Sequence, residues 1–150
     1  MTALLEALAA SGPSAMLRTS FWLYPLVSVL HVLSLGAVIT SVLLMDLHVL
    51  GAWRRVPQQT MTGLLRPVAF ASFAIVLLSG LMLFSVRPLA YLENGAFRLK
   101  LILIGLAVIN AGAFFALSRG NGIVRKVLAA LSLLLWPIVA IAGRFIGFVE

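Results

Sequence analysis

The sequence predicts an all-α fold, an integral membrane four-helix bundle with a short N-terminal interfacial helix. Of its 150 residues, 63% are hydrophobic and only 10% are charged, and the mean hydropathy is +1.16. Soluble domains are about half apolar and about a quarter charged. The apolar runs are each long enough to cross the ~30 Å of bilayer hydrocarbon. We therefore expect a single four-span transmembrane domain over residues 1–150, in contact with the lipid bilayer.

The first twenty residues predict a short helix in the membrane interface rather than a secretory signal peptide. They lack a basic N-terminal region and carry Glu6, whereas a signal peptide begins with positive charge. Ser11, Gly12 and Pro13 should end this helix before the first span.

Four spans follow, over about residues 21–53, 66–86, 98–118 and 127–148. Trp22 and Tyr24 mark the start of the first span, because amphipathic aromatic side chains concentrate at the membrane interface. Pro67 suits the first turn of the second helix. Asn94 predicts a turn before the third span, and Pro137 should kink or locally open the fourth.

The charge balance is basic, with 11 Lys and Arg against 4 Asp and Glu and a net charge of +7. The cations lie mostly at the ends of apolar runs, which indicates anchoring at the membrane surface and not nucleic-acid binding. Four spans place both termini on one side, and the positive-inside rule favours the other side as cytoplasmic. That side carries Arg54, Arg55, Arg66, Arg119, Arg125 and Lys126, against Arg18, Arg87, Arg98, Lys100 and Arg144 on the terminal side.

His31 is the first candidate functional residue, since it lies inside the first span, about 14 Å of helix from Trp22. An ionisable side chain near the bilayer centre costs about 2.5 to 3.5 kcal/mol and usually faces a partner or a cofactor. Three interpretations are open: haem or metal ligation, a proton-relay or substrate role, and a structural hydrogen bond between helices.

Cations gather at the same end of the predicted bundle. Alternating span directions bring Arg98 and Lys100, at the start of the third span, and Arg144, near the end of the fourth, toward His31. A histidine beneath such cations suits haem b, because the iron binds a neutral imidazole and the two propionates need cationic partners. Another anionic, partly apolar ligand would suit it equally, and arginines at span ends also meet lipid phosphate.

The other end of the first span carries Asp46 and His48. Asp46 follows His31 by 15 residues, which places it about 60° around and about 22 Å along the helix, so the two side chains cannot touch. His48 is about 25 Å from His31 and cannot bind the same iron within one chain. We expect a structural ion pair of Asp46 with Arg66 or Arg55. The alternative is a proton-transfer or cation-entry group at the far end of a path.

Other residue types narrow the chemistry. Asn110, deep in the third span, is expected to form a hydrogen bond between helices, with ligand contact as the alternative. The chain has no cysteine, which excludes disulfides, iron–sulfur clusters and thiolate metal sites. Metal or haem ligation must therefore rest on His, Met, Asp or Glu. No phosphate-binding glycine loop, paired catalytic carboxylates or HExxH motif is present, so the sequence leaves enzymatic activity open.

Four runs of residues resemble an uncharacterised family of small bacterial four-helix membrane proteins, over nearly the whole chain. These runs are LHVLSLGAVITSVLLMDLHVLG, LLRPVAFASFAIVLLSGLMLF, AFRLKLILIGLAVINA and WPIVAIAGRFIGF. More distantly, the chain is similar to the CopD copper-resistance membrane domain and to HemJ-type protoporphyrinogen oxidase. The shared order is a first-span histidine, an Arg-Pro opening and a Ser-Gly pair in the second span, and a lysine opening the third.

This resemblance implies haem binding or copper handling in the bacterial inner membrane, with His31 as the haem or metal ligand and Lys100 as a porphyrin-carboxylate contact. The third-span interior carries Asn110 and no second histidine, so the resemblance does not extend to a bis-histidine site or to HemJ-like catalysis. We therefore expect haem b or a related redox cofactor to be bound by His31, Arg98, Lys100 and Arg144, with electron transfer as the activity.

Two alternatives remain open. One is a copper or proton-linked transporter of CopD type, in which His31 and Asp46 mark the two ends of one path. The other is a non-catalytic anchor subunit of a larger redox complex. We expect both termini on the periplasmic side, with a redox protein, another membrane subunit or a second copy of the chain as candidate partners.

Overall fold

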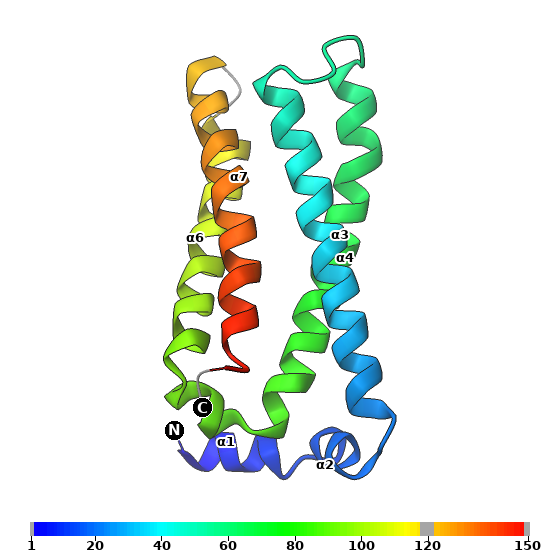
Figure 1. Cartoon of the computed structure of the whole chain (residues 1–150), viewed down its shortest axis with the longest axis vertical. Helices are drawn as coiled ribbons and strands as arrows, with labels where there is room; N and C mark the ends of the chain where they lie inside the picture. Colours follow the sequence, from blue (N-terminus) through cyan, green and yellow to red (C-terminus); the bar gives the residue numbers. More distant parts are fainter. Residues whose placement is uncertain (1, 118–121, 149–150) are drawn as a thin grey trace.

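A computed structural model describes residues 2–117 and 122–148, which form α-helices and short connections (Figure 1). The long helices are α3 (Leu23–Leu50), α4 (Gln58–Val86), α6 (Gly95–Leu117) and α7 (Gly122–Phe145). The short ones are α1 (Thr2–Ala9), α2 (Gly12–Thr19) and α5 (Pro88–Glu93). Arg119, one of the cations counted for orientation, lies outside the described residues.

The predicted fold class is confirmed. The structure is all-α, and α3, α4, α6 and α7 are each long and apolar enough to cross a membrane. Large apolar side chains face outward on these helices, among them Leu33 at 68% exposure and Ile109 at 69%. A soluble protein would bury such side chains, whereas lipid solvates them. The protein is a multi-pass integral membrane protein in contact with the bilayer.

The four long helices run up and down, and both termini lie at the same end (Figure 1). Helix α3 packs against α4 and α7, and α6 packs against α7. Across the described residues, the backbones of α4 and α6 do not approach each other closely, and long side chains bridge them: the Phe84 and Phe97 rings stack with centroids 5.5 Å apart, and Arg66 lies over the Phe115 ring. The bundle is therefore two helical hairpins whose backbones meet through α3 and α7, while side chains bridge the wider seam between α4 and α6.

The core lies where α3 and α7 meet. Val38, Ala107 and Trp136 are buried together there, and the Phe73 ring meets the Trp136 ring edge-on with centroids 6.3 Å apart. Small polar side chains fill much of the remaining interior, because small residues let membrane helices approach closely. The buried serines of the long helices are Ser34, Ser41, Ser72, Ser79, Ser85 and Ser132.

The N-terminal region has two helices where the sequence predicts one. Helix α1 ends at Ala9, before Ser11, as expected. Gly12 and Pro13 then open α2, because the fixed φ of proline suits a first helical turn. Helices α1 and α2 lie across the terminal end of the bundle (Figure 1). The hydroxyl of Ser14 in α2 donates to the Ser85 carbonyl at 2.8 Å, which ties this layer to the end of α4.

The predicted start of the second helix at Pro67 is wrong. Helix α4 begins at Gln58, after Pro57, and Pro67 lies inside it. An interior proline removes one backbone hydrogen bond but does not forbid a membrane helix, because neighbouring groups satisfy the freed carbonyl. Helix α7 likewise continues through Pro137 to Phe145, so that proline leaves the helix unbroken.

Candidate functional site

His31 lies on α3, half-buried, and faces α4. Its Nδ1 atom is 2.9 Å from the hydroxyl oxygen of Ser79. That hydroxyl donates its single proton to the Ile75 carbonyl of its own helix at 2.6 Å. The Ser79 oxygen can then only accept from His31, so Nδ1 carries the imidazole proton. The neutral ring therefore keeps the lone pair on Nε2, the nitrogen available for a ligand.

Gly80 makes room for this imidazole. A Cβ atom at position 80 would lie 3.1 Å from Cε1 of His31 and 3.6 Å from its Nδ1. The first of these distances is closer than ordinary van der Waals contact, so a larger residue would push the ring away. The adjacent pair Ser79 and Gly80 thus fixes both the tautomer and the position of His31.

Lys100 of α6 lies toward the same end of the bundle as His31. Its aliphatic chain lies against Gly143 of α7, where an added Cβ would be 3.1 Å from Nζ and 3.3 Å from Cε. Its charge is close enough to His31 to act on the imidazole. The structure therefore places Lys100 within electrostatic range of His31, with one glycine beside each of them.

Arg98 and Arg144 lie at the terminal end of the bundle and are exposed. Arg98 donates from Nη2 to the Glu93 carbonyl at 3.5 Å. The Arg144 guanidinium lies over the Phe148 ring, 5.2 Å from its centroid. Both side chains are free to reorient toward an acidic group, since neither is buried.

The side chains of His31 and Lys100, toward the terminal end of the bundle, fit a cofactor that takes one imidazole ligand from this chain. Histidines that bind metals usually donate their other ring N–H to a fixed acceptor, and Ser79 supplies that acceptor for His31. Lys100 supplies a cation beside it. Among the described residues, no group of three or more His, Cys, Asp or Glu side chains could hold a metal ion by itself.

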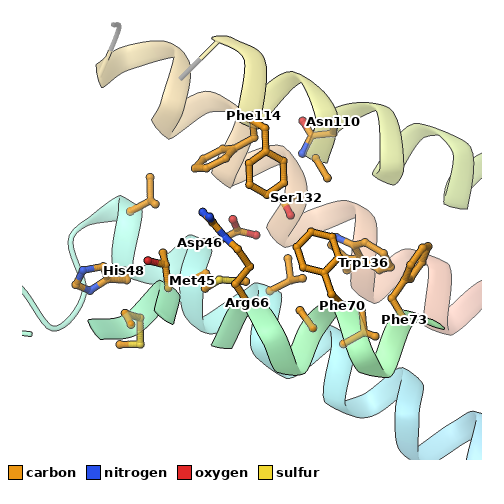
Figure 2. Close-up of a pocket in the computed structure, with 18 of the residues that line it drawn as sticks. Met45, Asp46, His48, Arg66, Phe70, Phe73, Asn110, Phe114, Ser132 and Trp136 are labelled. Carbon is orange, nitrogen blue, oxygen red and sulfur yellow. The ribbon is translucent and has the colours of Figure 1, made fainter. Parts of the chain in front are cut away.

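The other candidate residues gather at the opposite end, around a cavity of about 220 Å³ (Figure 2). Asp46, His48, Arg66 and Asn110 all line it. Asp46 is only 7% exposed, and its Oδ2 atom is buried with no hydrogen-bond partner among the described residues. The Ser132 side chain of α7 interacts with the same carboxyl group. Nδ1 of His48 is also buried and unpartnered within the described part of the chain.

The expected ion pair of Asp46 is not formed within the described residues. The Arg66 guanidinium instead lies over the Phe115 ring, 5.0 Å from its centroid, and Asp46 keeps an unpartnered oxygen. Asn110 donates from Nδ2 to the Leu128 carbonyl at 3.0 Å, which is the bond between helices that the sequence led us to expect.

The sequence did not identify the residues that support these groups as site residues. Ser79 and Gly80 contact His31, Gly143 contacts Lys100, and Ser132 interacts with Asp46. Ser79 and Gly80 entered only as the Ser-Gly pair of the resemblance, and the other signal in the sequence is small size or a hydroxyl within an apolar span. That signal also describes ordinary helix contacts in membranes, so it does not single them out.

Comparison of the chain with protein-family models, with curated proteins and with solved structures gives no match. The resemblance to small bacterial four-helix membrane proteins therefore stays a prediction from the residue runs quoted above.

Proposed function

We propose that this membrane protein binds haem b or a related redox cofactor through Nε2 of His31 and takes part in electron transfer. The observation that carries the proposal is the bond between His31 and Ser79, which leaves Nε2 as the nitrogen with a lone pair. A half-buried imidazole held in this tautomer by a second residue is typical of a ligand to iron. When bound, a haem supplies one-electron chemistry.

Lys100, Arg98 and Arg144 are the proposed partners of the cofactor's acidic groups. The charge of Lys100 acts on the His31 imidazole, and the two arginines are exposed at the terminal end. Cation–carboxylate contacts at the membrane surface would orient the cofactor. The chain offers one imidazole at this level, so a second axial ligand would come from another residue type, another subunit or a small molecule.

An absorbance spectrum of the protein purified from its native membrane tests this proposal. We expect a Soret band, and we expect the His31→Ala variant to lose it. Asp46→Asn is the matched control, because it changes an ionisable residue of the same helix at the opposite end and should keep the band. A native preparation without a Soret band, and without one after haem addition, would rule the proposal out.

A second candidate function is copper or proton-linked transport. The observation that favours it is the presence on α3 of two interior ionisable residues, His31 near one membrane end and Asp46 near the other. Ionisable groups inside a membrane helix often mark an ion or proton path. Uptake into vesicles, with metal analysis, tests this function. Unchanged uptake in a His31→Ala variant would contradict a path through that residue.

We further infer that the protein lies in the bacterial inner membrane with both termini periplasmic. The support is the excess of cations near the α3–α4 and α6–α7 connections, which the positive-inside rule places in the cytoplasm. An anchor role in a redox complex would require a second subunit. Detergent-extracted protein that migrates alone, without a soluble partner, would argue against that role.

A further inference from the structure

The cavity at the Asp46 end has walls suited to an aromatic ring. Its apolar lining combines aliphatic side chains of α3 with aromatic rings of the other three long helices (Figure 2). The aromatic side chains that line it are Phe70, Phe73, Phe114, Phe115 and Trp136. Ligand sites are typically apolar concavities with a few placed polar groups, and volumes of roughly 300–1,000 Å³ hold drug-sized ligands. A cavity of about 220 Å³ therefore suits a single substituted ring.

This cavity reaches the lipid-facing surface. It is lined from both α4 and α6, whose backbones do not approach each other closely across the described residues and which are bridged at this cavity by Arg66 lying over the Phe115 ring. Phe70 of α4 is 60% exposed and Phe115 of α6 is 47% exposed. Because these two wall residues face outward on spanning helices, a ligand dissolved in the bilayer could reach the cavity wall without crossing water.

The polar groups of the cavity specify a neutral ligand with both a donor and an acceptor. Asp46 Oδ2 is a buried acceptor without a hydrogen-bond partner among the described residues. Leaving a buried carboxylate oxygen without a partner costs free energy of folding. Arg66 brings a cation with several N–H donors to the same cavity. An organic cation would meet repulsion from Arg66, and an anion would meet it from Asp46.

We propose that this cavity binds the headgroup of a membrane-soluble hydroquinone, with one hydroxyl donating to Asp46 and the other ring oxygen accepting from Arg66. A hydroquinone is planar, neutral and lipid-soluble, and it carries oxygens on opposite sides of one ring. The proposal concerns binding alone and does not depend on a haem at His31.

Trp136 gives a direct readout, because it lines the cavity. In a Trp22→Phe, Trp53→Phe background it is the only tryptophan of the chain. We expect trimethylhydroquinone, added anaerobically to the detergent-solubilised protein, to quench its fluorescence saturably. The dimethyl ether of the same compound is the matched probe, since it keeps the ring but has no hydroxyl donor. Its binding should be weaker by about tenfold or more, the effect of losing a hydrogen bond to a charged group.

Two variants locate the site. Asp46→Leu should weaken trimethylhydroquinone binding by about tenfold or more, whereas Met45→Leu, a neighbouring cavity residue without charge, should change it little. Ala111→Phe fills the cavity from α6 and should abolish binding even if Asp46→Leu fails to fold. Equal binding of the hydroquinone and its ether, tighter binding of phenyltrimethylammonium, or binding unchanged in Ala111→Phe would each overturn the proposal.

Discussion

His31 acquires its chemical character from α4 and not from its own helix. Ser79 accepts the Nδ1 proton only because its own hydroxyl is committed to the Ile75 carbonyl. The sequence places His31 inside the membrane but cannot supply this partner, which is 48 residues away. A spanning helix is apolar on all sides, since its outer face meets lipid, so no hydrophobic stripe tells which face meets a neighbour. The candidate residue was predictable, and its tautomer was not.

Gly80→Ala should destabilise the protein, because the added methyl group would lie 3.1 Å from Cε1 of His31. Overpacking of this kind costs about 1–3 kcal/mol, more than the roughly 0.5–1 kcal/mol that alanine gains over glycine in a helix. Gly105→Ala is the control, since nothing lies within 4 Å of a Cβ there. Thermal unfolding in detergent should give a lower midpoint for Gly80→Ala and an unchanged or higher one for Gly105→Ala. Equal midpoints would mean that the ring is not held against Gly80.

Tyr91, on α5 outside the spans, should make stability depend on alkaline pH. Burial raises the pKa of Tyr91 from 10.0 to about 12, and a hydrogen bond with Tyr24 adds to this shift as the smaller cause. The folded state thus disfavours the phenolate form of Tyr91. The stabilisation that comes from the neutral Tyr91 side chain is therefore complete below pH 10 and is lost as the pH rises toward about 12. The melting midpoint of the wild type should fall across this window more steeply than that of Tyr91→Phe. Parallel curves would show that Tyr91 titrates normally.

At the scale of the helices, length and apolarity were enough to predict four spans, because a membrane helix needs about 20 apolar residues. Boundaries were harder to predict. The proline at position 67 suggested a helix start, whereas α4 extends back to Gln58 and its first turns project beyond the apolar run. There the Arg125 guanidinium donates to the Gln58 side-chain oxygen at 2.8 Å, a contact between α7 and α4 that the sequence could not show. Tertiary contacts of this kind decide where a polar helix end stops.

Asn94 should stabilise α6 through its side chain. Its Oδ1 accepts from the backbone N–H groups of Ala96 and Phe97 at 2.9 and 3.1 Å, and its Nδ2 donates to the Ile146 carbonyl at 3.3 Å. Asn94→Ala removes both the acceptor and the donor and should lower the free energy of unfolding by about 1 kcal/mol or more. Asn94→Asp keeps the acceptor at the helix start and loses only the donor, so it should cost less. Chemical denaturation in mixed micelles measures the free energy of unfolding of both variants. Equal losses of stability in the two variants would show that the contact with Ile146, and not the helix cap, provides the stabilisation.

At the scale of the whole molecule, the sequence predicts a bundle but not which helices are neighbours. Four spans can pack in several arrangements, and short connections only require consecutive helices to be close. In the structure, the backbones of α3 and α7 join the two hairpins, while α4 and α6 are farther apart and are bridged by side chains across the described residues. This arrangement creates the cavity at the Asp46 end, and it explains why residues from all four spans line one site.

The orientation of the molecule can be tested directly, because the chain contains no cysteine. Met16 in α2 is exposed at the terminal end, and Gln59 is exposed at the start of α4 on the opposite end. If the termini are periplasmic, a membrane-impermeant thiol reagent added to cells with a permeable outer membrane should label Met16→Cys. Gln59→Cys should react only after the inner membrane is opened. The reverse pattern would invert the proposed orientation. Labelling of both variants in cells with an intact inner membrane would contradict the four-span topology, because one span, α3, separates these two residues and must place them on opposite sides.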